Sequence, residues 1–230
     1  MAKLKRNDYV YVPASKAGLK NHGWAMVSGE IKSISKYGIR ISLPNGNLSN
    51  IIGVNLVRKK LGILIVTIGD YSTEETLLKP LTKSILQYSR LLCSDDCIKT
   101  IFVRSLKELE YYWKLEHSIV SHLVLVGHGE KNALLFGGDW VNPNDLNKIL
   151  DGVGKIVEGK QIISLCCKTG SAEFGSVISS KQICEIFVGP SGSVHAAYAS
   201  QFYQTFMVLQ LLNGYSVTKS YDWARIATPG

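Results

Sequence analysis

The sequence predicts an α/β fold, a three-layer αβα sandwich with a mainly parallel sheet, preceded by a small all-β module. Three observations predict it. Nearly unbroken aliphatic runs, of the kind found in strands buried on both faces, recur in the second part of the chain. Helical segments separate these runs, which implies βαβ crossovers. Residues 1–60 contain instead short β-rich segments between turn residues, so we predict two domains, 1–60 and 61–230.

The first sixty residues are predicted to form an antiparallel meander. Its strands are expected within 8–14, 24–37, 38–44 and 47–57. Alternation of Ile31, Ser33 and Ser35 with the residues between them and an Asn45-Gly46 turn support this pairing. About five such strands resemble a small SH3-like barrel, a superfold that says little about the ligand.

The second part begins with an aliphatic strand at 61–68. Leucines and isoleucines at helical spacing predict a helix over 74–92, in which Pro80 marks a bend or a first-turn start. The elements expected next are a strand at 98–105, a helix at 106–116 and a strand at 121–129.

The last hundred residues are predicted to continue the same alternation. A small hairpin turns at Gly137-Gly138, and Gly214 is well placed to end a long helix. The expected elements are a helix at 143–150, strands at 159–167 and 182–188, and helices at 171–179, 194–213 and 216–226.

The formal net charge of +8 is unevenly distributed. Residues 1–60 hold eleven Lys or Arg residues against Asp8 and Glu30, a net charge of +9, whereas the rest of the chain holds 15 basic and 16 acidic side chains. This asymmetry suits an anionic partner, whether nucleic acid, a nucleotide-type activating ligand, a membrane surface or an acidic patch on a protein. A well-solvated lysine surface explains it equally well. Exposed tyrosines or Trp24 could stack on bases, although a small module needs them for its core.

The sequence predicts a cytoplasmic protein without membrane association. It starts on polar residues, and no run approaches about 18 uncharged apolar residues. The odd number of cysteines predicts reduced thiols rather than a disulfide framework. Cys93 and Cys97 lack the spacing and the partner pair of a zinc site, so we expect no metal or cofactor, and we expect the two to pack a helix–strand corner.

Two reactive groups follow consecutive predicted strands. His128-Gly129 ends the third strand and Cys166-Cys167 ends the fourth, and the carboxyl ends of neighbouring parallel strands meet at one edge. A thiol attacks an acyl carbon as its thiolate, so a catalytic cysteine needs a base such as His128. The backbone N–H groups of Gly129 and Cys167 are the predicted oxyanion hole.

The segments L-V-G-H-G (125–129) and S-L-C-C-K-T-G (164–170) resemble the caspase-like CHAT peptidases, which belong to clan CD. Those enzymes pair a His-Gly with a strand-terminal Cys-x-Thr-Gly, and the similarity extends over roughly residues 61–226. The resemblance implies a caspase-like cysteine endopeptidase that cleaves protein substrates, as a regulated effector in a prokaryotic defence or cell-death pathway. The stricter animal caspase signature is not met, since only 39 residues separate His128 from Cys167.

Only one of the two adjacent cysteines can face the histidine, because neighbouring strand residues point to opposite faces. Matching C-K-T-G to the Cys-x-Thr-Gly of the family makes Cys167 the nucleophile and gives Cys166 a packing position. Cys166 stays the alternative, since strand ends twist. His122 begins the same strand as His128 and is expected to be structural.

The resemblance also implies a substrate-binding role for Asp70. Related peptidases that prefer basic residues carry an acid at the end of the first strand, where Asp70 stands in V-T-I-G-D-Y. Its carboxylate would favour Arg or Lys before the cleaved bond. Equally, Asp70 fits a helix-capping turn together with Ser72 and Thr73.

A protein of a different class explains the same sequence: a catalytically inactive α/β adaptor whose basic N-terminal module binds nucleic acid or a protein partner. A nucleotide-binding α/β protein is disfavoured, because T-I-G-D-Y-S follows the first buried strand in place of a glycine-rich phosphate loop.

Overall fold

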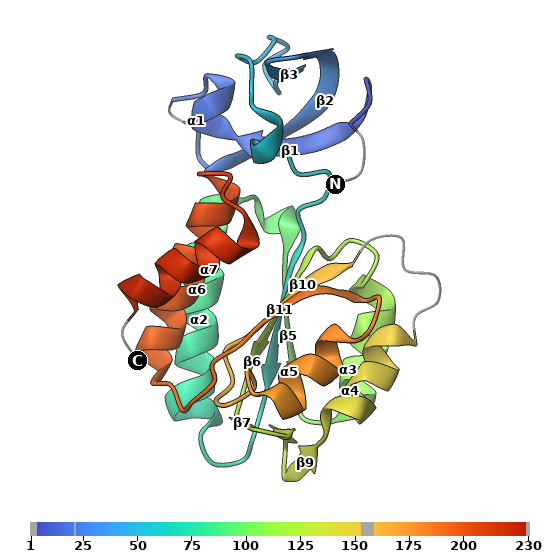
Figure 1. The fold of residues 1–230 in the computed structure, drawn as a ribbon, viewed down its shortest axis with the longest axis vertical. Helices are drawn as coiled ribbons and strands as arrows, with labels where there is room; N and C mark the ends of the chain where they lie inside the picture. Colours follow the sequence, from blue (N-terminus) through green and yellow to red (C-terminus); the bar gives the residue numbers. More distant parts are fainter. Residues whose placement is uncertain (1–3, 21, 153–158, 229–230) are drawn as a thin grey trace. The chain divides into compact units, whose positions relative to one another are not determined.

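A computed structural model describes residues 4–20, 22–152 and 159–228 (Figure 1). Met1–Lys3 of the predicted N-terminal module lie outside the described residues. The chain forms two compact units: one consists of Met1–Leu61, Gln87–Cys97 and Gln201–Pro229, and the other of Gly62–Leu86 and Ile98–Ser200. The first unit therefore contains two segments from beyond residue 60, which the sequence pattern alone does not indicate.

The predicted N-terminal meander is present in the first unit. Its strands are β1 (Tyr9–Pro13), β2 (Met26–Ser35) and β3 (Gly38–Ile41), and β1 and β3 both pair antiparallel with β2. Apolar side chains from all three strands form a core of their own, because alternate residues of each strand face inward.

Residues 47–57 differ from the expected strand. They make single bridges, Ile39 with Ile52 and Ser42 with Leu48, and then a 3-10 turn, η1 (Val54–Leu56). The Asn45-Gly46 turn is present, with Gly46 at φ +81°. Three strands and single bridges do not establish an SH3-like barrel, so that part of the fold stays a prediction.

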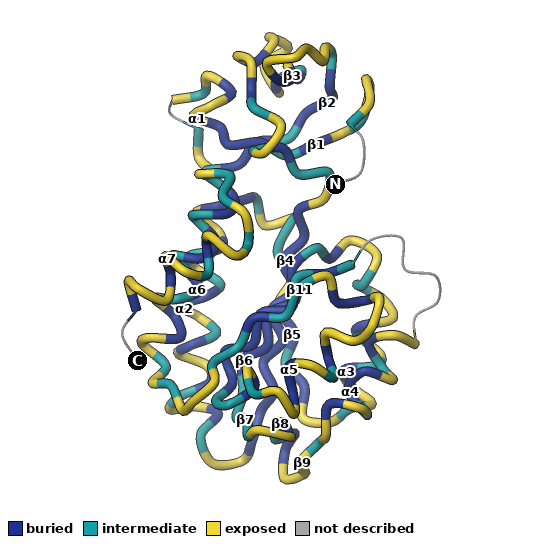
Figure 2. The backbone as a smooth tube through the Cα atoms, in the orientation of Figure 1, coloured by how far each residue is buried: buried dark blue, intermediate teal, exposed yellow. Residues whose placement is uncertain are grey.

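The second unit is built on a five-stranded parallel sheet. Its order is β11-β10-β6-β4-β5, and every neighbouring pair is parallel. The strands are β4 (Ile63–Ile68), β5 (Ile98–Val103), β6 (His122–Val126), β10 (Lys160–Ser164) and β11 (Cys184–Val188). Central strands β4 and β6 are buried along their whole length (Figure 2), as the aliphatic runs predict.

Alternation along β4 separates the two faces of this sheet. Leu64, Val66 and Ile68 point into a core shared with three helices, which lie together on one side of the sheet in Figure 1. Thr67 points the other way, and its hydroxyl oxygen lies 2.6 Å from that of Thr82 on helix α2. The three helices are α3 (Leu106–Glu116), α4 (Pro143–Asp151) and α5 (Ala172–Ser179). Helices thus cover both faces of the sheet, in agreement with the predicted α/β class.

Helix α2 (Lys79–Leu92) has Pro80 as its second residue. The residues before it, Glu74–Leu78 (η2), form a π-helical turn instead of the expected α-helix. The C-terminal helices are α6 (Ala196–Leu211) and α7 (Val217–Ala227), separated by Gly214 at φ +67°. No helix among the described residues combines the length and the apolar character needed to cross a membrane.

The predicted hairpin is also present. It consists of β8 (Ala133–Phe136) and β9 (Asp139–Val141), and β7 (Gly129–Glu130) pairs with β8 on its other side. Gly137 turns the hairpin at φ +60°, and its N–H donates to the Gly69 carbonyl at 2.8 Å. The hairpin is thereby attached to the end of β4.

Strands β6 and β10 end earlier than the aliphatic runs do, at Val126 and Ser164. The ladder makes one more bond beyond the strand ends, from the Leu165 N–H to the Leu125 carbonyl at 2.8 Å. His128 and Cys167 consequently lie in loops beyond the sheet, where side chains can turn toward each other.

Candidate active site

Three loops converge at the carboxyl edge of the sheet. They follow β4, β6 and β10 and carry Asp70, His128 and Cys167. The chain runs from β4 outward to β5 and then back to β6 on the other side, so the strand order reverses between β4 and β6. Ligands of open parallel sheets bind at such a reversal, in the crevice beyond the strands. The predicted adjacency of the histidine and cysteine strands is confirmed.

His128 is held through its Nε2 atom. The Thr73 hydroxyl oxygen lies 2.5 Å from Nε2, and Asp70 Oδ2 lies 3.0 Å from it. Thr73 Oγ1 also lies 2.6 Å from Asp70 Oδ2, so its single proton is donated to the carboxylate and its oxygen accepts from the imidazole. This chain of donors places the ring proton on Nε2 and leaves Nδ1 as the basic nitrogen.

Asp70 is buried, with 3% of its surface exposed. Its Oδ1 accepts from the backbone N–H groups of Ser72 and Thr73, both at 2.6 Å. Burial alone would raise the pKa of this carboxyl, but the hydrogen bonds from Thr73 and Ser72 outweigh it and lower the pKa to about 2. Asp70 is therefore ionised at any physiological pH. The turn with Ser72 and Thr73 that the sequence offers is present, and the substrate-binding role stays a prediction.

A tight turn follows β10 and presents Cys167. The buried Thr169 hydroxyl donates to the Cys166 carbonyl at 2.8 Å and also lies 2.8 Å from Ser164 Oγ. Lys168 adopts φ +60°, a left-handed conformation that is uncommon outside glycine. A Cβ at Gly170 would come within 2.2 Å of the Gly189 carbonyl, so this position admits only glycine. These contacts explain physically why threonine and glycine follow the cysteine.

The two adjacent cysteines have different surroundings. Cys166 is fully buried among core side chains, and burial raises its thiol pKa to about 12. Cys167 is partly exposed in the loop. A thiol that stays protonated inside the core is unsuited to nucleophilic attack, so the environment favours Cys167 over Cys166.

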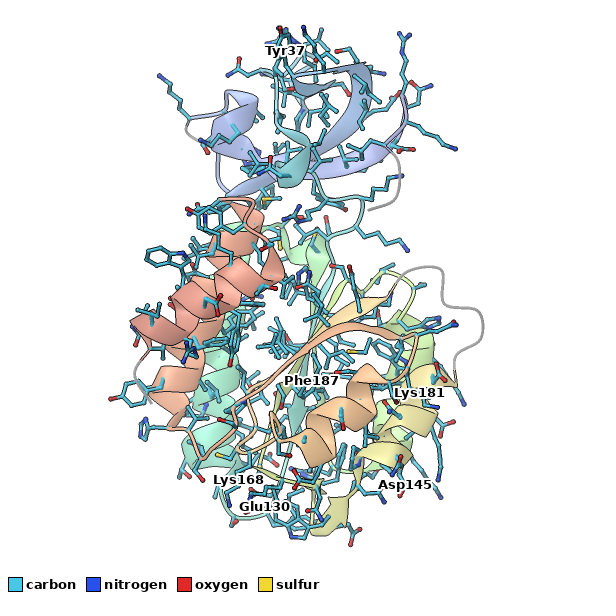
Figure 3. All side chains as sticks on the ribbon, viewed as in Figure 1. Tyr37, Glu130, Asp145, Lys168, Lys181 and Phe187 are labelled. Atoms are coloured by element: carbon cyan, nitrogen blue, oxygen red, sulfur yellow. The ribbon has the colours of Figure 1, made fainter. Side chains whose placement is uncertain are left out.

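The loops after β6 and β10 touch each other. A Cβ at Gly129 would lie 2.6 Å from the Cys167 carbonyl oxygen and 3.0 Å from Cys166 Cβ. Glu130 and Lys168, the next residues of the two loops, form an ion pair at 2.8 Å and lie close together in Figure 3. Both side chains are partly exposed, so the pair adds at most about 1 kcal/mol and serves chiefly to fix the loops. The oxyanion hole of Gly129 and Cys167 stays a prediction.

The segment 189–194 runs beside Cys167. The Val194 N–H donates to Cys167 Sγ at 3.4 Å, and Sγ lies 3.7 Å from the Val194 carbonyl oxygen. Two further bonds attach the segment, from Lys168 N–H to the Gly192 carbonyl and from Gly170 N–H to the Pro190 carbonyl, at 2.8 and 2.7 Å. We call residues 189–194 the strap.

Sequence reasoning missed two contacts at this site. Thr73 was expected only in a capping turn, yet its hydroxyl bridges Asp70 and His128. The strap was missed because it follows an edge strand and carries no reactive side chain; only its Gly-Pro-Ser-Gly composition indicates a turn at this edge. His122 is buried at the start of β6, its Nδ1 2.8 Å from Ser121 Oγ, in a structural setting. No cluster of three or more His, Cys, Asp or Glu side chains within 4–20, 22–152 and 159–228 could hold a metal ion.

The fold is similar to that of a secreted C11 cysteine protease from Bacteroides thetaiotaomicron, solved in complex with an irreversible peptide inhibitor. The two share 12% sequence identity with a TM-score of 0.54, over 73% of this chain and 58% of the protease. This chain thus spans little more than half the length of that enzyme. An azoreductase from Bacillus anthracis str. Sterne aligns at 8% identity and a TM-score of 0.36, over 73% of this chain and 98% of the other. No family profile matches the sequence, and no curated protein matches it.

Proposed function

We propose that this protein is a cysteine endopeptidase with Cys167 as nucleophile and His128 as base. One observation carries the proposal: at the carboxyl edge of a parallel sheet, an imidazole oriented by a buried carboxylate stands on the loop that touches the loop of a partly exposed cysteine. The fold likeness to a C11 cysteine protease supports the same chemistry. Protein substrates follow from that reaction class.

The orientation of His128 supports the following course for the proposed proton transfers. Because Nε2 donates toward Thr73 and Asp70, Nδ1 takes the proton of the Cys167 thiol. The ionised Asp70 then stabilises the imidazolium that forms, as a buried carboxylate does in other nucleophile–histidine pairs. The Cys167 thiolate attacks the scissile carbonyl carbon and forms a C–S bond.

Collapse of the tetrahedral adduct breaks the C–N bond, and the imidazolium gives its proton to the leaving amine. Water, deprotonated by the same imidazole, then cleaves the thioester and regenerates the thiol. The N–H groups of Gly129 and Cys167 are the proposed donors to the oxyanion in both steps.

We retain Asp70 as the proposed determinant of a preference for Arg or Lys before the cleaved bond. Asp70 is buried and contacts His128, so its charge would attract a basic substrate side chain from behind the proposed base. Cleavage of peptides that differ only in Arg, Leu or Asp at that position, by wild type and Asp70→Ala, tests this role. A variant that loses rate on all three peptides equally would argue against it.

For residues 1–60 we propose an SH3-like regulatory module that recognises an anionic ligand, a nucleotide or nucleic acid, and makes the enzyme a regulated effector in a prokaryotic defence or cell-death pathway. The net charge of +9 supports an anionic ligand. Exposed Tyr37, with the Lys36 ammonium 4.9 Å from its ring centroid, offers a stacking surface.

The decisive experiment is labelling with a peptide that carries a thiol-reactive electrophile, followed by mass spectrometry of the modified cysteine. We expect label on Cys167 in wild type and in Cys166→Ala, and none in Cys167→Ala. Proteome-wide cleavage by wild type and Cys167→Ala, with nucleotides and nucleic acids added, then identifies substrates. A Cys167→Ala protein that still cleaves would refute the proposal.

One observation favours the inactive adaptor as a second candidate. Cys167 Sγ is hydrogen-bonded to the backbone of Val194, which is how a non-catalytic thiol packs in a loop. An adaptor leaves Cys167 unlabelled and binds polyanions through residues 1–60 with an affinity that falls steeply as salt rises.

A further inference from the structure

A second pair of cysteines lies in the first compact unit, whereas Asp70, His128 and Cys167 belong to the second. Cys93 follows the last turn of α2, and Cys97 ends a 3-10 turn, η3 (Asp95–Cys97). Cys93 is buried, with 1% of its surface exposed, and Cys97 is partly exposed. The Cys93 thiol donates to the Ser89 carbonyl at 3.8 Å, and the Cys97 sulfur lies 3.7 Å from the Ser94 hydroxyl oxygen. The sequence indicates only that they pack a corner between a helix and a strand.

Three groups close to Cys97 act on its thiol. They are the Cys93 thiol, the Ser94 hydroxyl, whose oxygen lies 3.7 Å from the Cys97 sulfur, and the Tyr11 hydroxyl. Cys93 is the main cause of a lowered pKa at Cys97, with Ser94 and Tyr11 adding to it against the opposing effects of burial and the Asp96 charge. Cys97 and burial in turn raise the pKa of Cys93. One sulfur is thus stabilised as a thiolate while its neighbour keeps its proton.

The pair opens onto a pocket of about 80 Å³. Tyr11, Trp24, Met26 and Pro44 line it together with the two cysteines. All of these residues belong to the same compact unit. A pocket of this size has room for a molecule as small as hydrogen peroxide, and its wall is polar as well as apolar, since His22, Ser28 and Ser94 also line it.

We propose that Cys97 and Cys93 form a peroxide-reactive dithiol site, with Cys97 as the attacking and Cys93 as the resolving thiol. The Cys97 thiolate attacks one oxygen of hydrogen peroxide, and the O–O bond breaks. Hydroxide leaves, and Cys97 becomes a sulfenic acid. The Cys93 sulfur then attacks the Cys97 sulfur, the S–O bond breaks, and water leaves with the Cys93 proton. Both sulfurs lose one electron each to the peroxide, and a disulfide results.

The other buried cysteines provide an internal comparison. Burial raises the thiol pKa of Cys184 to about 11 and that of Cys166 to about 12, so both are protonated at neutral pH. Thiolate character and access together decide which cysteine a peroxide oxidises. Oxidation should therefore be selective for the Cys97 site over Cys166 and Cys184.

The test uses the full-length Cys167→Ser protein, in which the proposed peptidase nucleophile cannot react. After brief exposure to dilute hydrogen peroxide, peptide mass spectrometry should find a Cys93–Cys97 disulfide. The peptide that contains both cysteines should be lighter by two hydrogen atoms, and a thiol reductant should restore its mass. We expect oxidation there at least about tenfold faster than at Cys184. Equal rates at both sites, or oxidation only of unfolded protein, would overturn the proposal.

Two variants separate the roles of the two thiols. Cys93→Ser should stop the reaction at a Cys97 sulfenic acid that dimedone captures, whereas Cys97→Ser should leave Cys93 reduced. Tyr11→Phe removes one donor and should slow oxidation severalfold, while the matched Tyr9→Phe, next to it on the same strand, should not. Capture of sulfenic acid on Cys93 in place of Cys97 would contradict the assignment. Because Cys167 is absent, the outcome is independent of the proposed peptidase activity.

Discussion

The imidazole Nε2 of His128 and the Oδ2 atom of Asp70 lie 3.0 Å apart, and the Thr73 hydroxyl bridges them. The loops after β4 and β6 are thus joined by a buried, ionised carboxylate. A nucleophile–histidine pair with such a carboxylate behind the base has its imidazole in one tautomer and one orientation before substrate arrives. The contact with His128 therefore explains the burial of Asp70 without any role in substrate binding.

Removal of the Thr73 hydroxyl should lower kcat. Thr73→Val keeps the shape of the side chain but breaks the bridge between Asp70 and His128. Because the bridge would orient the proposed base, we expect kcat to fall by roughly 10- to 100-fold with little change in KM. Thr73→Ser should restore most of the rate. A Thr73→Val enzyme with altered KM alone would contradict an orienting role.

Asp70 should make the protein sensitive to acid. Its pKa is about 2 in the folded protein, against about 3.9 in an unfolded chain. The folded state therefore binds this proton less readily, and its stabilisation is present above about pH 4 and lost as pH falls toward 2. The shift corresponds to about 2–3 kcal/mol of unfolding free energy.

Urea unfolding of wild type and Asp70→Asn, measured from about pH 6 down to about pH 2, tests this linkage. The stability advantage of wild type over the variant should shrink as pH falls through that range. Asp139→Asn is the control, since that residue is exposed in strand β9 of the same unit. An advantage that stays constant with pH would show that Asp70 contributes no such titration.

The sequence predicts the parallel sheet and the position of the candidate site at its edge, because buried strands are recognisable as continuous aliphatic runs. Strands β4 and β6 are aliphatic along their length, and helix α3 has the predicted bounds, with a capping box in which Ser105 and Glu108 satisfy each other's backbone N–H groups. The rule that consecutive strands tend to be neighbours holds for β6 and β10, which carry the two loops of the proposed dyad, but not for β5 and β6, since β6 pairs with β4.

The remaining features depend on contacts between residues distant in the chain. Residues 87–97 and 201–229 belong to the first unit, but no periodicity in their sequence indicates this. The Thr73 bridge needs the side chains of two different loops, and the strap reaches Cys167 through its backbone, which any residue type could supply. The Tyr11–Cys97 contact likewise joins a first-strand tyrosine to a cysteine that follows α2.

Gly129 should tolerate no side chain. A Cβ there would overlap the Cys167 carbonyl at 2.6 Å and Thr169 Cγ2 at 2.9 Å, so Gly129→Ala must push the two loops apart. We expect a loss of about 1–3 kcal/mol in unfolding free energy and of at least about tenfold in the labelling rate of Cys167.

Gly138→Ala, in the hairpin of the same unit, is the matched control. Nothing lies within 4 Å of a Cβ at Gly138, so stability and labelling should stay close to wild type. Chemical unfolding and the rate of electrophile labelling measure both effects. If the two alanine variants behave alike, the loops do not depend on their close approach at Gly129.

The strap should move when Cys167 is occupied. The Val194 N–H donates to the Cys167 sulfur, and the Val194 carbonyl oxygen also contacts that sulfur. An acyl group on the sulfur would therefore take space that the strap now fills. Hydrogen–deuterium exchange of a peptide spanning 189–194 should therefore accelerate after labelling by the peptide electrophile, while exchange in β6 stays slow. Cys167→Ala treated with the same reagent gives the baseline. Unchanged or slower exchange in the labelled protein would mean that substrate binds alongside the strap, and that the nucleophile is accessible without displacing it.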